Sequence, residues 1–132
     1  MRRMFVAVVI GIVVTSALSA RPVADVQQAS MDPLVVSPDH YRLVFENEYV
    51  RVIRQQMAGR DRVPMHQHAM GAVMVLVTDQ NQRQALPDGT TREQHRKAGE
   101  IFWSEPVTHA GENLSDNPYE YIRVDIKATT RR

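Results

Sequence analysis

Short alternating segments between residues 41 and 127 restrict what this chain can fold into more than any other feature. Residues 49–57 and 119–127 alternate apolar and polar side chains, which is the period of a half-buried strand. The expected strands are 41–45, 49–57, 72–78, 90–97, 101–103, 108–114 and 119–127. Because polar turns separate them and no stretch among them has a helical period, we expect an all-β fold, a small sandwich or a barrel.

Two parts of this region are interpreted from composition rather than from alternation. The apolar run 72–78 has strand length and is typical of a strand buried on both faces. Residues 79–82, DQNQ, and 87–89, PDG, are rich in turn formers, so both are expected to be turns.

The first twenty residues have the layout of a secretory signal peptide. Arg2 and Arg3 precede an apolar run at 4–14 and small residues at 15–20, and cleavage is expected after Ser19 or Ala20. The apolar run is far shorter than the roughly 20 residues that span a bilayer. The alternative is an uncleaved N-terminal anchor, and in both cases the working domain lies outside the cytoplasm, in a periplasmic or extracellular location.

The rest of the chain has room for one domain. Residues 21–40 show no sustained periodicity and are interpreted as a linker or N-terminal arm, and residues 41–128 as the β-barrel domain. Without the leader, 14 basic residues face 15 acidic ones, and no basic cluster with aromatics remains, which argues against a nucleic-acid partner. The chain has no cysteine, so disulfides are excluded and any metal must be bound by His, Asp, Glu or Met.

Two histidines two residues apart are the main candidates for chemistry. His66 and His68 stand in the stretch PMHQHAM, and residues i and i+2 of a strand point to the same side. This is the spacing of metal ligands, although two polar residues at a strand edge would give the same pattern. A third histidine, His109, lies on or beside a late strand, in GEIFWSEPVTHAGEN.

At these motifs the chain resembles the cupins, which are double-stranded β-helix (jelly-roll) barrels with a metal site inside. The first cupin motif is matched by Gly59 followed by His66-Gln67-His68, with one residue more than usual between them. The second is matched from Gly99 through Pro106 to His109, with Asn113 at the expected distance. The resemblance covers roughly residues 45–127 and implies a metal site formed by His66, His68 and His109.

The chain departs from the cupin pattern where the family has a glutamate ligand. Three or four residues after His68 stand Ala72 and Val73, neither of which binds a metal, and the family's Pro-x-Gly turn is replaced around Pro106. The resemblance therefore implies three histidines without a carboxylate. Such a site leaves a divalent ion its full charge and favours an anionic chelating ligand.

Three functions follow from such a site, and the sequence does not choose a reaction. The first is a metal-dependent enzyme, most specifically an oxygenase acting on a small chelating anion, as in some cupins that lack the glutamate. The others are a non-catalytic protein that binds a small ligand and an exported copper-binding protein, with Met57, Met65, Met70 and Met74 as further donors. The ion is a divalent transition metal, Fe, Ni, Cu, Zn or Mn, of unassigned identity.

No residue is assigned a catalytic role and no organic cofactor is expected. Asn113 is interpreted as a structural hydrogen-bonding residue, and His40 and His95 as ordinary surface histidines. Trp103 and Tyr121 are expected to pack in the core rather than to line a pocket. Apolar residues in 41–53 suit a homodimer contact, and no stable membrane partner is expected after leader cleavage.

Overall fold

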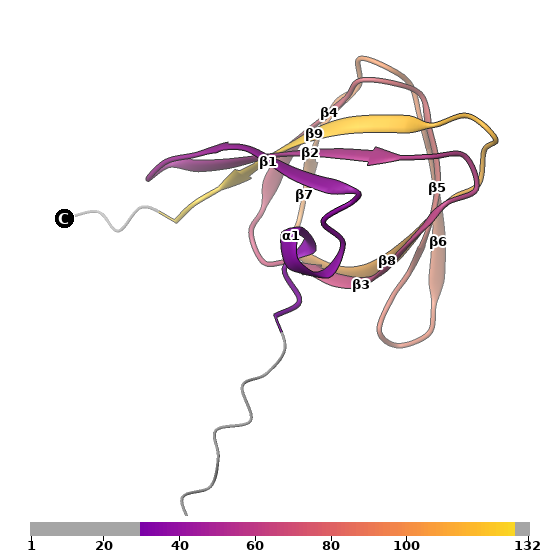
Figure 1. Ribbon diagram of the computed structural model, residues 1–132, viewed down its shortest axis with the longest axis horizontal. Helices are drawn as coiled ribbons and strands as arrows, with labels where there is room; N and C mark the ends of the chain where they lie inside the picture. The colour runs from indigo at the N-terminus through magenta and orange to yellow at the C-terminus, as the bar shows by residue number, and fades with distance from the viewer. Residues whose placement is uncertain (1–29, 129–132) are drawn as a thin grey trace, which may run out of the picture.

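The protein folds into two antiparallel sheets that face each other around a common interior (Figure 1). The computed structural model describes residues 30–128, so the expected leader and residues 21–29 of the expected linker lie outside the described part. One sheet has five strands in the order β1-β2-β9-β4-β7, and the other has four in the order β3-β8-β5-β6. The strands are β1 Tyr41–Glu46, β2 Val50–Met57, β3 Arg62–His68, β4 Ala72–Leu76, β5 Gln80–Ala85, β6 Thr91–Arg96, β7 Ile101–Ser104, β8 Val107–Asn113 and β9 Tyr119–Ile126.

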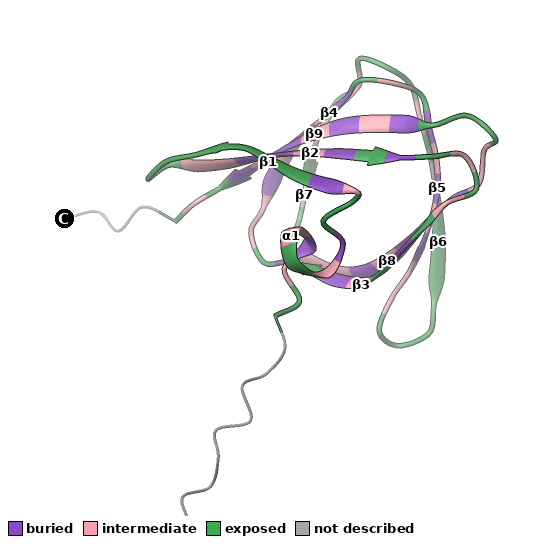
Figure 2. Ribbon diagram, in the orientation of Figure 1, coloured by how far each residue is buried: buried purple, intermediate pink, exposed green. Residues whose placement is uncertain are grey.

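Alternating burial along the strands gives the barrel its interior, as Figure 2 shows. In β9, the odd-numbered residues from Tyr119 to Asp125 are buried and the even-numbered ones are more exposed. The expected all-β architecture is confirmed, and burial alternates with a period of two along most strands, interrupted in β2 by the burial of both Val52 and Ile53. The strand β4 alternates in the same way, so the expectation that 72–78 is buried on both faces is wrong.

The expected turn at 79–82 is also wrong, because Gln80–Ala85 form strand β5 between β6 and β8. Its inward residues are Gln80, Gln82 and Gln84, all buried. Glutamine and asparagine have low strand propensity in general, but that preference depends strongly on what a strand faces. Here the strand faces a polar interior, which composition alone does not reveal.

The described part of the N-terminal arm packs against the barrel. The helix α1, Pro33–Val36, is a single turn capped by Asp32, whose side chain accepts a hydrogen bond from the backbone of Leu34. The same Asp32 carboxylate binds the Arg51 guanidinium on β2. The backbone N–H of Gln67 on β3 donates to the Met31 carbonyl at 2.7 Å. Within residues 30–128, no helix has the length and apolar character needed to span a bilayer.

The hairpin of β1 and β2 extends beyond the barrel, toward the left in Figure 1. Only Tyr41 of β1 is buried, whereas Leu43, Val44 and Phe45 are exposed. The strand β1 also lies at the edge of its sheet, with one side unpaired among the described strands. An exposed apolar edge strand of this kind is a surface on which further chains pack.

Candidate metal centre

A bulge in β3 turns the two histidines of PMHQHAM into the barrel. Val63 pairs with Gly111 and His66 with His109, so the register shifts by one residue between them. Pro64 stands in this bulge, where a residue without an N–H is tolerated. Val63, His66 and His68 are all buried, whereas an unbroken period of two from Val63 would have turned both histidines outward.

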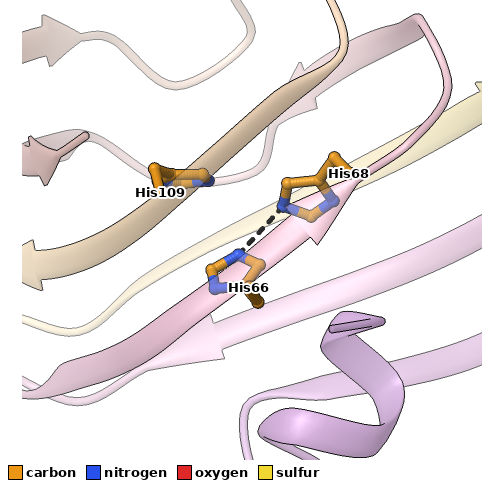
Figure 3. A group of neighbouring side chains, drawn as sticks. All are labelled: His66, His68 and His109. Atoms are coloured by element: carbon orange, nitrogen blue, oxygen red, sulfur yellow. Dashed lines mark hydrogen bonds between the residues drawn. The ribbon is translucent and has the colours of Figure 1, made fainter. Parts of the chain in front are cut away.

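The third histidine reaches the same place from the neighbouring strand. His109 of β8 lies directly across from His66 in the antiparallel ladder, and their ring centroids are 4.6 Å apart. One ligand atom from each of the three histidines lies within 4.8 Å of the others, and all three side chains are buried (Figure 3). The structure thus brings together the three residues that the sequence singled out.

Hydrogen bonds fix the orientation of the His66 ring. Its Nδ1 lies 2.8 Å from the Pro64 carbonyl, which only accepts, so Nδ1 carries the proton. Its Nε2 therefore has a lone pair directed into the barrel, 3.1 Å from Nε2 of His68. A metal-binding histidine is oriented in this way when its other nitrogen donates to a carbonyl.

Burial keeps the three imidazoles neutral. It lowers the pKa of His66 and brings the pKa of His68 far below its ordinary value, with the positive charge of Arg123 adding to the effect at both. Burial, followed by the nearby His66, lowers the pKa of His109 to about 3. Neutral imidazole is the form that binds a metal ion.

The residues present fit a transition-metal ion. Nδ1 of His68 and Nδ1 of His109 are buried and have no hydrogen-bond partner among residues 30–128. Ala72 stands close to the position at which the cupin pattern has its glutamate ligand, and it is completely buried on β4. Within the described residues, the candidate ligand group contains no carboxylate. The donor set is three nitrogen ligands of the kind that suit Fe, Ni, Cu and Zn.

A small polar cavity of about 40 Å³ borders His68 and His109. The buried glutamines of β5 line it together with Tyr121 and Arg123. Since a water molecule takes up about 30 Å³ in the liquid, the cavity has room for about one water or a ligand group of that size. The Gln82 Nε2 amide is buried without a partner among the described residues, so the cavity offers a donor to such a ligand.

A buried ion pair lies behind this cavity. Arg123 is 1% exposed, and its Nε donates to the Asp125 carboxylate at 2.5 Å. The same guanidinium donates to the Met70 carbonyl at 2.6 Å and to the Ser104 hydroxyl at 3.3 Å. The sequence analysis does not identify this pair, although the period of two along β9 places Arg123 and Asp125 on the same inward face as Tyr121.

Several other residues have different surroundings from those expected. Trp103 is exposed rather than packed in the core, since it stands on the outer face of β7. Tyr121 is buried as expected but also lines the cavity. His40 is partly buried, with its ring held between the Ser37 hydroxyl and the Asp61 carboxylate, whereas His95 is exposed as expected.

The remaining motif residues have structural roles. Asn113 bridges two loops, because its Nδ2 donates to the Ala58 and Asn117 carbonyls, which confirms the structural interpretation. A Cβ at Gly59 would lie 2.0 Å from the Asp116 carbonyl oxygen, so only glycine allows this close approach. Gly99 has φ +84°, a conformation that favours glycine.

Comparison with known proteins places this fold among the cupins. No protein-family profile matches the chain, and no curated protein sequence matches it significantly. A cupin domain protein of Bordetella pertussis Tohama I is 25% identical, with a TM-score of 0.62, over 67% of this chain and 92% of its own. A double-stranded β-helix protein of Klebsiella pneumoniae is 20% identical, with a TM-score of 0.50, over 64% of this chain and 72% of its own. An RmlC-like cupin of Methanocaldococcus jannaschii is 14% identical, with a TM-score of 0.52, over 65% and 77% respectively.

These likenesses show that the chain shares its fold with the cupins. The expected fold is therefore confirmed: the chain has the double-stranded β-helix fold of the cupins, with a three-histidine group and without the usual glutamate of the first motif.

Proposed function

We propose that this protein is an exported cupin that binds a divalent transition-metal ion through His66, His68 and His109. The observation that carries the proposal is the convergence of three buried, neutral imidazoles from two paired strands. Burying three such groups without a ligand costs free energy, because two ring nitrogens then lack any partner within residues 30–128. An ion bound through one nitrogen of each ring would offset part of the cost of burying the three imidazoles.

The second part of the proposal concerns what the site binds besides the ion. A divalent ion acts as a Lewis acid that attracts and orients an anion. The three histidines add no negative charge to the ion, and the unpartnered Gln82 amide beside the cavity can donate to an anion. We therefore propose a small chelating anion as ligand or substrate, and oxygen-dependent cleavage of that anion as the most specific form of the activity.

The surroundings of the methionine sulphurs make a dedicated copper-binding protein the less favoured alternative. The sulphur of Met57 accepts a hydrogen bond from the Tyr119 hydroxyl at 2.8 Å. The sulphur of Met74 accepts from the Arg123 guanidinium at 3.6 Å, so both sulphurs already have a hydrogen-bond donor. A non-catalytic protein that captures a small ligand through the same metal ion is the remaining alternative.

The metal site is tested with mature protein purified without a polyhistidine tag. We expect one transition-metal ion per chain by elemental analysis, and a loss of affinity of at least about tenfold when any one of the three histidines is replaced by alanine. His95→Ala is the matched control, because His95 is exposed on β6. Equal binding by all four variants would exclude the three-histidine site.

The reaction is tested separately. Oxygen uptake by the metal-loaded protein, measured with diketones, flavonols and thiols, distinguishes an oxygenase from a non-catalytic binding protein. An oxygenase consumes oxygen only with its substrate and only with the three histidines intact, whereas a binding protein shows ligand-induced changes in the metal spectrum without oxygen uptake.

A further inference from the structure

A tyrosine hydroxyl lies among the histidine nitrogens, at a position that neither cupin motif includes. Tyr41 is the first residue of β1 and is only 2% exposed. Its Oη lies 2.9 Å from Nε2 of His66, which is the nitrogen that faces the barrel interior. Its ring centroid is 5.1 Å from that of His66 and 5.8 Å from that of His68.

The distances around His66 are those between neighbouring ligands of one ion. Ligand atoms at about 2.1 Å from a metal and at right angles to each other are about 3.0 Å apart. Nε2 of His66 lies 3.1 Å from Nε2 of His68 and 2.9 Å from the Tyr41 oxygen. The Tyr41 oxygen and Nε2 of His68 thus lie at similar distances from Nε2 of His66, as two neighbouring ligands of one ion would.

Gln55 holds the Tyr41 oxygen in the orientation of a ligand. It lies directly across from Tyr41 in the β1–β2 ladder and is completely buried. Its Nε2 donates to the Tyr41 oxygen at 2.8 Å, so the hydroxyl proton is left to His66. When an ion takes the lone pair of His66, that hydroxyl loses its acceptor, while the amide of Gln55 continues to stabilise charge on the oxygen.

The site also lacks a negative charge that cupin sites usually contain. Ala72 supplies no carboxylate, and the ligand group of the described residues consists of histidines alone. A phenolate is an anionic oxygen ligand that would compensate for that absence.

We propose that Tyr41 is the fourth protein ligand of the metal ion, bound through its phenolate oxygen and oriented by Gln55. The inference rests on the proposed three-histidine metal site. On binding, the O–H bond of the phenol breaks, the proton passes to solvent, and the oxygen lone pair binds the ion; no electron is transferred.

The test uses Cu(II) as the probe, because a phenolate bound to Cu(II) gives a charge-transfer band in the visible spectrum. We expect the wild-type protein to develop this band with one equivalent of Cu(II), together with tyrosinate ring vibrations in the resonance Raman spectrum. Tyr41→Phe should lose both signals and bind Cu(II) at least about tenfold more weakly. Tyr119→Phe is the matched control, since Tyr119 is equally buried but its hydroxyl contacts Met57, and it should retain both signals.

The outcomes separate this inference from the metal site itself. Failure of the wild-type protein to bind Cu(II) overturns the proposed site, and the role of Tyr41 with it. Binding of one Cu(II) through the histidines without the band overturns the role of Tyr41 alone. If Tyr41→Phe does not fold, wild-type protein containing ring-deuterated tyrosine decides the question: the Raman bands excited in the visible must shift, and unshifted bands refute the proposal.

Discussion

Removing the carboxylate of Asp125 should destabilise the protein more than any surface change of the same kind. Asp125 is buried, and it is the only anionic partner of Arg123 among the described residues. Asp125→Ala leaves a buried guanidinium with three neutral partners, the Ser104 hydroxyl, the Met70 carbonyl and the Met74 sulphur. Breaking a buried pair in this way costs about 3–5 kcal/mol.

A milder substitution separates charge from hydrogen bonding. Asp125→Asn retains an oxygen that accepts from Nε of Arg123 but removes the charge, so we expect a loss of about 1.5–3 kcal/mol. The double substitution Arg123→Met with Asp125→Leu removes both charges and should recover most of the stability lost in Asp125→Ala.

The free energies are measured by urea unfolding followed by circular dichroism. The control is Asp116→Ala, because Asp116 pairs with Arg60 on the surface with 85% of its side chain exposed, and its loss should cost less than about 1 kcal/mol. If Asp125→Ala costs no more than Asp116→Ala, the buried pair does not stabilise the fold as argued.

Three further predictions concern pH, association and export. The metal-free protein should lose stability as the pH falls from about 6.5 toward 3. The reason is that the pKa of His109 is lowered to about 3 in the folded protein, so the unfolded chain binds more protons in this range. Urea midpoints measured across this range should fall less steeply with pH in His109→Gln. We expect a homodimer formed through the exposed edge strand β1. Sedimentation should show Phe45→Glu as a monomer at concentrations where the parent chain is dimeric. If the variant and the parent chain have the same mass in solution, the expected dimer contact is wrong. Mass spectrometry of exported protein should find an N-terminus at Ala20 or Arg21, whereas an intact Met1 would indicate an anchor.

The sequence predicted the strands whose two faces differ in polarity. The observed strands β2 and β9 lie at the expected residues 49–57 and 119–127, and β9 has the expected period of two in burial. Their inward faces are not purely apolar, because Gln55, Arg123 and Asp125 are buried. The strand β5 was missed because Gln80, Gln82 and Gln84 face a polar interior, so its two faces do not differ in hydrophobicity. Periodicity cannot detect a strand of that kind.

The candidate site was predictable only in part, for a related reason. His66 and His68 are two residues apart, so their common face follows from strand geometry. Their partner His109 is 41 residues further along the chain, and its position depends on the register of β8 against β3, which only the family resemblance suggested. Tyr41 and Arg123 belong to no motif. Their proximity to the histidines depends on how the two sheets face each other, which the sequence pattern does not give.

The bulge at Pro64 allows a strand with one extra residue to keep both histidines inside the barrel. Val63 and His66 are three residues apart, so a regular ladder at this length would turn both histidines to the outer face, although every ligand would still be present in the chain. Deleting one residue between Val63 and His66 would instead remove the bulge and leave both histidines on the inner face. Among related chains, a one-residue difference in the spacing before His-x-His is therefore compatible with the same site when a bulge accompanies it.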